Sequence, residues 1–272
     1  MDIDWITDES DWAAALDGAG RAPLQQSWAY GQAMARLGAR VRRAVLHHGG
    51  QISAAQMLER RGLRLINRAP LVSRPLLRRL ARQPGLTLAT SPLRGPGVVP
   101  LMTDRFHAEW DLRPEPAALQ RALSRDWRAR LRQATARITQ GDARAMAEIA
   151  ARDAAQAQAR GYRPLPPAFL QAWPGEVLTL QYRPDGPLSA GIVVLIHGNE
   201  ASYHCAFADA QGRAAQAHRA MLWQAALALR ARGITRLDLG AVDSATPGLA
   251  RFKLGTGAAL VSLGPASLIL PG

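Results

Sequence analysis

Short segments in which hydrophobic and polar residues alternate occupy the first 112 residues, separated by turns rich in glycine and proline. A period of two predicts β-strands, and Ser27 is a suitable N-cap for a helix that ends near Gly38. The expected elements after that helix are strands at 41–46, 52–58 and 63–66, a short helix at 75–82, and strands at 86–89 and 106–112.

Helical spacing dominates the middle of the chain. Leu119, Leu123, Trp127 and Leu131 recur every fourth residue, which predicts one apolar stripe on a helix that begins near Pro116. A second stripe, on another face, is basic and either solvated or in contact with phosphate; it consists of Arg121, Arg125, Arg128 and Arg132. A further helix is expected from Asp142, a good N-cap, to Gly161.

The second half repeats the order of the first. It predicts strands at 177–182, 188–196 and 201–207, helices at 214–232 and 247–254, a strand at 234–239, and one or two strands in 258–270. An antiparallel meander, a helix and a return strand in each half indicate an α/β protein of the α+β type. We expect two copies of one unit, with domains at 1–115 and 116–272.

Arginine sets this composition apart. The chain of 272 residues has 34 basic and 21 acidic residues and a formal net charge of +13. Thirteen arginines and one acidic residue lie between positions 36 and 94. This density suits an anionic partner such as RNA, a phosphorylated cofactor or an anionic lipid, but a genome that favours arginine codons explains it equally well.

Several classes of protein are excluded. The apolar content of 48% argues against disorder, and the single Cys205 against a disulfide scaffold or a zinc site built on thiolates. The N-terminus resembles no secretion signal, and no apolar run approaches the length of a membrane span. We therefore expect a cytoplasmic protein without a metal site.

Two segments of the second half carry candidate chemistry. Asp209–Arg213 stands where a strand gives way to a helix; there Gly212 lets a ligand approach the backbone and Arg213 adds charge, unless the segment is a plain connecting loop. Lys253 is the only lysine of the chain and lies in a glycine-bracketed motif, 252–257. A compact ammonium fits one oxyanion in a tight site better than a guanidinium does.

Other polar residues favour structural interpretations. His204 and Cys205 fall on opposite faces of a strand, so a Cys–His pair is not expected. Tyr203 is a candidate contact for substrate, with core packing as the alternative. Asp243, after the Gly240 turn, is a candidate general base or a cap, and Asp238 is expected to hold a neighbouring loop.

Together these motifs resemble the FemAB-like branch of the GNAT acyltransferase superfamily. The resemblance is clearest from about 120 to 260. It rests on the segments 26–31, 127–134, 161–170, 201–204, 220–227, 232–234, 237–240 and 252–257.

This resemblance implies twin GNAT-like domains, each a mainly antiparallel sheet flanked by helices. It also implies transfer of an acyl or aminoacyl group, from acyl-CoA or aminoacyl-tRNA, directly to an amine acceptor, a small molecule or a peptide. Lys253 would stabilise the tetrahedral intermediate, and the C-terminal domain would carry the donor site. The residues assigned to the donor are Gly212, Arg213, Phe252, Gly255 and Gly257; those assigned to the acceptor are Ser27, Trp28, Tyr30 and Tyr203.

Two alternatives stay open at this point. The donor is either acyl-CoA, with its phosphates near Gly212 and Arg213, or aminoacyl-tRNA, for which this chain has no long coiled-coil hairpin. The non-enzymatic alternative is an RNA-binding or anionic-ligand-binding module on an inactive acyltransferase fold.

Overall fold

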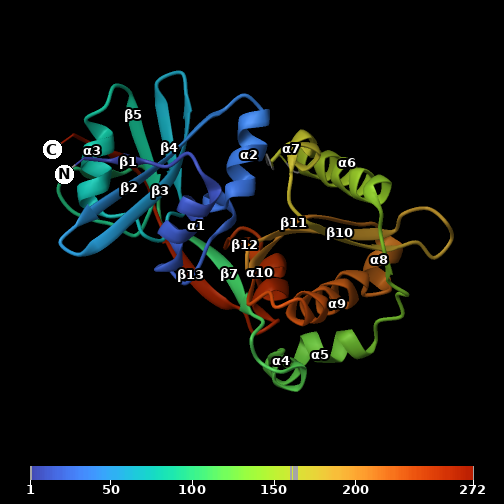
Figure 1. Cartoon of the computed structure of the whole chain (residues 1–272). Helices are drawn as coiled ribbons and strands as arrows, with labels where there is room; N and C mark the ends of the chain where they lie inside the picture. Colours follow the sequence, from blue (N-terminus) through green and yellow to red (C-terminus); the bar gives the residue numbers. More distant parts are fainter. Residues whose placement is uncertain (1, 160, 162–164, 272) are drawn as a thin grey trace. The chain divides into compact units, whose positions relative to one another are not determined.

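The computed structural model describes residues 2–159, 161 and 165–271, and the chain divides into two compact units. The first unit consists of Met1–Phe106, Ala172–Pro174 and Ser262–Gly272, and the second of His107–Gln171 and Gly175–Val261. Each unit contains most of one seven-stranded sheet (Figure 1).

The sheet of the first unit has the order β1-β2-β3-β4-β5-β14-β6. Its strands are β1 (Asp4–Trp5), β2 (Arg40–His48), β3 (Gln51–Arg60), β4 (Leu63–Asn67), β5 (Leu86–Thr90), β6 (Val98–Pro100) and β14 (Ala266–Ile269). Strands β2, β3 and β4 form the predicted antiparallel meander, and β5 runs parallel to β4.

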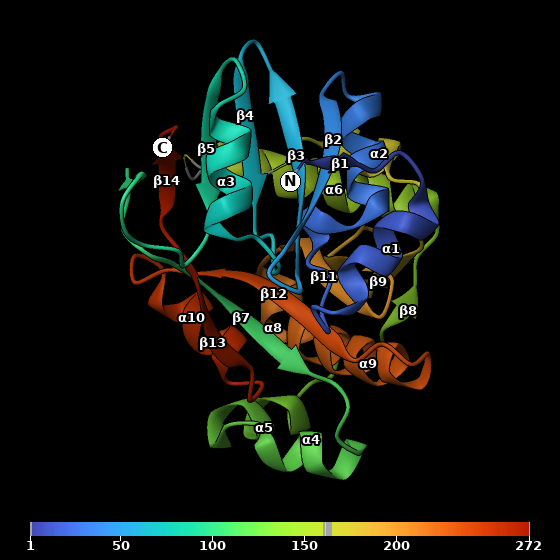
Figure 2. The same cartoon turned by 60° about the vertical axis from the view of Figure 1, so that its left-hand side comes forward.

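Helices of the first unit begin at the polar caps that the sequence offers. They are α1 (Glu9–Asp17), the 3-10 turn η1 (Leu24–Gln26), α2 (Trp28–Arg36) and α3 (Arg74–Ala81). Asp8, Ser27 and Ser73 each accept a hydrogen bond from a backbone N–H of the first turn that follows. Helix α3 lies over the sheet in Figure 2 and buries Leu76, Leu77 and Leu80 in the core of this unit.

The second sheet has the order β13-β7-β12-β11-β10-β9-β8. Its strands are β7 (Arg105–Asp111), β8 (Thr139–Gln140), β9 (Val177–Tyr182), β10 (Ala190–His197), β11 (Glu200–Ala208), β12 (Arg236–Val242) and β13 (Ala259–Gly264). Again a meander, β9-β10-β11, is followed by a strand, β12, that runs parallel to its last member.

Helices cover both faces of this second sheet. They are α4 (Pro116–Ala122), α5 (Arg125–Arg132), α6 (Ala143–Ala159), α7 (Pro167–Ala172), α8 (Ala210–Ala214), α9 (Ala217–Ala231) and α10 (Pro247–Leu254). Figure 1 shows α6 and α9 on opposite sides of β10 and β11. The larger core packs α9 residues such as Met221, Leu222 and Leu229 against Ile192 and Val194 of β10.

The two sheets have the same order of strands when the first is read from β1 and the second from β8. In that direction, β1-β2-β3-β4-β5-β14-β6 corresponds to β8-β9-β10-β11-β12-β7-β13. The predicted repetition of element order is therefore confirmed. The sixth position of each sheet is filled by a strand from the opposite half of the chain: β14, near the C-terminus, pairs with β5 and β6, and β7 lies between β12 and β13.

Two helix predictions were wrong in the same way. The helix expected from Pro116 is broken at Leu123, whose ψ of 139° is extended, and Ser124 caps α5 as a new start. The helix expected over 214–232 begins only at Ala217, after Gln216 adopts a left-handed φ of 54°. The apolar stripe is still buried at Leu119, Leu123 and Trp127.

Helix α6 confirms the helix predicted after Asp142, whose carboxylate accepts a hydrogen bond from Ala145 N at 2.9 Å. Residues 160 and 162–164, which belong to that helix end and to the 161–170 motif, lie outside the described residues.

Candidate functional site

Lys253 is buried in the second unit. It lies in the last turn of α10, a helix that begins at Pro247, and only 7% of the residue is exposed. Its Nζ donates a hydrogen bond to the carbonyl oxygen of Ala241 at 2.6 Å. Burial lowers the pKa of this ammonium, and the nearby charge of Asp238 partly opposes that shift.

A bend in β12 presents the carbonyl that holds Lys253. Gly240 has a φ of 80°, and its N–H donates to Oδ1 of Asp238 at 2.7 Å. A Cβ on Gly240 would lie 3.5 Å from Lys253 Nζ, so the bend passes close to the ammonium. Asp238 thus holds the bend of its own strand, and the expectation that it holds a neighbouring loop stays a prediction.

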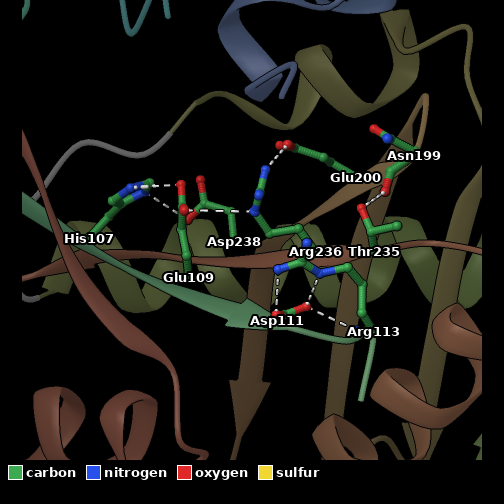
Figure 3. Close-up of polar contacts among 9 residues, drawn as sticks. All are labelled: His107, Glu109, Asp111, Arg113, Asn199, Glu200, Thr235, Arg236 and Asp238. Atoms are coloured by element: carbon green, nitrogen blue, oxygen red, sulfur yellow. Dashed lines mark hydrogen bonds and ion pairs between the residues drawn. The ribbon is translucent and has the colours of Figure 1, made fainter. Parts of the chain in front are cut away.

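Asp238 also belongs to a chain of charged side chains across β7, β12 and β11 (Figure 3). His107 Nδ1 lies 3.3 Å from Asp238 Oδ1, and its Nε2 lies 3.0 Å from Glu109 Oε1. Arg236 follows with an ion pair to Glu200 at 2.6 Å and a longer one to Glu109 at 3.8 Å. His107, Glu200 and Asp238 are each at least nine-tenths buried, so these polar side chains depend on one another for stabilisation.

Sequence reasoning missed His107, Glu109, Glu200 and Arg236. The signal was present, since His107, Glu109 and Asp111 occupy every second position of a strand that was correctly predicted. The intervening Ala108 and Trp110 lie in the core. Three polar residues at alternate positions of a strand whose other face is buried indicate a polar face that needs partners from the next strands.

A cavity of about 270 Å³ opens between α5, α8, α9 and α10, all in the second unit. It brings together Gly212, Arg213 and Phe252, three of the five residues predicted for the donor. Arg130, Arg219 and the start of α9 at Ala217 complete the basic part of its wall. Phe252 lines this cavity, and Lys253 follows it in the chain.

The cavity is electropositive. Arg130, Arg213 and Arg219 face it, and Asp126 offsets part of that charge through Arg130 at 2.9 Å and Arg219 at 3.7 Å. Burial, together with the charge of Arg130, lowers the pKa of Arg219. Because a helix N-terminus also favours negative charge, these groups can hold an anion such as a phosphate.

The segment Asp209–Arg213 is not a plain connecting loop, which was the alternative left open for it. It forms α8, and the Gly212 N–H donates to Asp209 Oδ1 at 2.8 Å. A Cβ on Gly212 would lie 2.4 Å from the carbonyl oxygen of Ser189, so this glycine allows α8 to pack closely against the start of β10. Its assignment to the donor stays a prediction.

Gly255 and Gly257 pack against the α4–α5 junction. The Gly255 carbonyl accepts a hydrogen bond from Ser124 N at 2.8 Å, and a Cβ there would lie 2.9 Å from Trp127. A Cβ on Gly257 would lie 3.0 Å from that of Ala122. The two glycines thus seat α10 on α4 and α5, and their assignment to the donor stays a prediction.

Asp243 and Tyr203 occupy different surroundings. Asp243 is exposed in the turn before α10, and its Oδ1 accepts a hydrogen bond from Ala245 N at 2.7 Å. Tyr203, on β11, packs against the core, and burial, with the charges of Cys205 and Asp153, raises the pKa of its hydroxyl. That hydroxyl remains protonated at neutral pH.

The predicted acceptor residues Ser27, Trp28 and Tyr30 lie in the first unit at the start of α2. Ser27 is the N-cap and accepts a hydrogen bond from Tyr30 N at 3.2 Å. The Arg43 guanidinium stacks on the Trp28 ring at 3.5 Å. Tyr30 is buried, and this burial raises the pKa of its hydroxyl. An acceptor role for the three residues stays a prediction.

His204 and Cys205 do not form a catalytic pair. His204 lies at a register shift of β11, its ring 5.4 Å from that of Phe169, and burial lowers its pKa to about 4. Burial also raises the pKa of the Cys205 thiol, so it does not supply a thiolate nucleophile at neutral pH. Among the described residues, no group of three or more His, Cys, Asp or Glu could hold a metal ion.

Comparisons with known proteins place this geometry in a family. The family model described as "Acetyltransferase (GNAT) domain" matches residues 116–254, just over half of the chain, including Gly212, Arg213 and Lys253. No curated protein matches. In the part of the chain that the structure describes, no helix is long and apolar enough to cross a membrane.

Solved structures share the fold over the whole chain. The crystal structure of FemX is 13% identical, with a TM-score of 0.76 that covers 100% of this chain and 98% of that one. A tandem GNAT protein from the clavulanic acid biosynthesis pathway is 13% identical, with a TM-score of 0.55 and coverage of 98% and 97%. A conserved protein from Bacteroides thetaiotaomicron is 11% identical, with a TM-score of 0.60 and coverage of 99% and 100%.

The chain therefore belongs to the GNAT family and is an N-acyltransferase with twin GNAT-like folds. Its fold is shared with FemX, in keeping with the resemblance of its motifs to the FemAB-like branch. An inactive binding module is not favoured. The reaction takes an acyl donor as co-substrate and an amine as acceptor.

Proposed function

We propose that this protein transfers an acyl group from acyl-CoA to an amine, with the donor bound in the second unit. The observation that carries the proposal is the electropositive cavity of about 270 Å³ at the start of α9, within the family match. Guanidinium groups from α5, α8 and α9 and the positive end of a helix suit the pyrophosphate of CoA. The acyl thioester would then extend past Phe252 toward Lys253.

The chemistry is a direct transfer. The amine nitrogen attacks the carbonyl carbon, the carbonyl electron pair moves to oxygen, and collapse of the intermediate expels the CoA thiolate while the nitrogen loses a proton. Lys253 has three N–H donors, one of which Ala241 takes up, and it stabilises the oxyanion. The exposed carboxylate of Asp243 accepts the proton that the amine nitrogen loses.

Binding of CoA tests this donor assignment directly. We expect CoA and acetyl-CoA to raise the melting temperature of the protein. At a ligand concentration one hundred times the Kd, binding adds about 2.7 kcal/mol to the free energy of unfolding. The Arg213→Gln variant should lose most of this shift, because it removes a guanidinium from the cavity wall. Arg137→Gln, at an exposed position that does not line the cavity, is the control with the same change of charge.

Two results would contradict an acyl-CoA donor. One is a melting temperature that neither CoA nor acetyl-CoA changes. The other is stabilisation by charged tRNA alone, with an affinity that falls steeply as salt rises, which would identify aminoacyl-tRNA as the donor.

A further inference from the structure

The first unit has a cavity of about 550 Å³ that the acyl-transfer site does not use. It lies where β2 begins and where β3 turns into β4, next to the segment that follows α3. Its described wall contains one acidic residue, Glu59, and the five arginines Arg40, Arg42, Arg60, Arg61 and Arg64. The wall thus carries four positive charges in excess.

Three of these guanidinium groups share one carboxylate. Glu59 lies 3.7 Å from Arg40, 3.5 Å from Arg42 and 3.0 Å from Arg64. A single negative charge cannot neutralise three positive ones at these distances, and Arg60 and Arg61 add two more. An anion in the cavity would remove this repulsion.

Two of the guanidinium groups are held in place before any ligand arrives. Arg42 stacks on the Trp5 ring at 3.4 Å and donates to Gln83 at 3.2 Å. Arg64 is 5% exposed and donates to the Leu80 carbonyl and, at 3.0 Å, to the Thr87 hydroxyl. Such fixed guanidinium groups lose little entropy when they bind an anion.

The fold does not require this excess of charge. In the second sheet, β10 turns into β11 at the corresponding position, and Figure 3 shows the polar groups there. Arg236 lies between the carboxylates of Glu200 and Glu109, Arg113 is paired with Asp111, and Asn199 and Thr235 are neutral. The same plan is therefore stable with balanced charges.

We propose that the cavity of the first unit binds the phosphate groups of a ligand with at least two negative charges. Guanidinium groups match phosphate oxygens in pairs, and the volume lies within the range of small-ligand pockets. The phosphates can belong to a free polyphosphate or to an RNA strand, because both present the same oxygens.

Calorimetric titration with inorganic pyrophosphate and with a short RNA hairpin tests the proposal. The variant Arg40→Gln/Arg60→Gln removes two exposed guanidinium groups and leaves the buried Arg64 intact. The control, Arg137→Gln/Arg144→Gln, removes two exposed arginines of the second unit. We expect the first pair of changes to weaken binding at least tenfold and the control pair to weaken it less than twofold.

The two ligands distinguish the source of the phosphates. Tight binding of pyrophosphate that is weakened in the Arg40/Arg60 variant, which retains the arginines of the donor cavity, identifies a free polyphosphate. Binding of the hairpin alone, with a slope of log K against log salt that is smaller by about 2 in the Arg40/Arg60 variant, identifies an RNA strand. Failure of both ligands to bind, or equal weakening in the two double variants, would overturn the proposal. None of these outcomes depends on the acyl donor.

Discussion

At the scale of single residues, the environment of Lys253 could be predicted only in part. Its uniqueness among 34 basic residues pointed to a special position, and the residue is indeed buried. Its partner, the Ala241 carbonyl, could not be predicted, because that contact depends on the Gly240 bend. The same holds for the contact of His107 with Asp238, which joins strands far apart in the sequence.

Lys253→Met is the residue-level test of the mechanism, since it keeps the length of the side chain and removes the ammonium. We expect turnover to fall on the order of a hundredfold, because one oxyanion donor is worth about 3–4 kcal/mol. Circular dichroism should show an unchanged fold. Turnover within twofold of the wild type would exclude the proposed role.

Turnover should also depend on pH through this residue. The ammonium form is the one that stabilises an oxyanion, and burial lowers its pKa. The rate in the wild type should therefore decline as the pH rises, and this decline should begin at a pH below 10.5, the usual pKa of lysine. A rate profile that is flat through this range would contradict the assignment.

His204 makes a separate prediction about stability. Its pKa is about 4 in the folded protein, against an ordinary value of 6.5, so between these values the unfolded chain binds more protons. Stability should therefore fall as the pH is lowered from 6.5 to 4, by up to about 3 kcal/mol from this residue. His204→Phe keeps the ring contact and should flatten the profile in urea titrations; parallel profiles for both proteins would refute this.

At the scale of helices and strands, the sequence was most informative. Alternation predicted both meanders, and the caps Ser27 and Asp142 placed helix starts correctly. The breaks at Leu123 and Gln216 were missed, because an apolar stripe at helical spacing continues across them. Ser124, a good N-cap in the middle of a predicted helix, was the available signal for the first break.

As the N-cap of α5, Ser124 should contribute measurably to the free energy of unfolding. Its Oγ accepts a hydrogen bond from Trp127 N at 3.3 Å, where α5 begins. Ser124→Ala should lower the free energy of unfolding by about 1 kcal/mol. Ser124→Thr keeps the hydroxyl and should restore most of that loss, whereas equal loss in both variants would show that the cap bond is not the cause.

At the scale of the whole molecule, it could not be predicted that each sheet contains a strand from the opposite half of the chain. Periodicity is a local property, and nothing in the alternation of 266–269 says which sheet that strand joins. The structure pairs it with β5 and β6 of the first unit. Local pattern thus predicted what each segment forms, and long-range pairing decided where it goes.

Removal of residues 265–272 tests this pairing. We expect limited proteolysis to cut the first unit rapidly, because β5 and β6 lose the strand between them, while the second unit retains its own sheet and stays protected. Uniform protection, or cleavage that starts in the second unit, would contradict the role of β14.

The position of β14 has a consequence for synthesis of the protein in the cell. Thr90 pairs with Ala266, so a nascent chain emerging from the ribosome displays the edge of β5 long before its partner exists. At about 5–20 residues per second, the wait lasts on the order of 10–35 s. An open strand edge invites pairing with other chains during that time, so this protein should need a chaperone during translation more than it does when the finished polypeptide refolds.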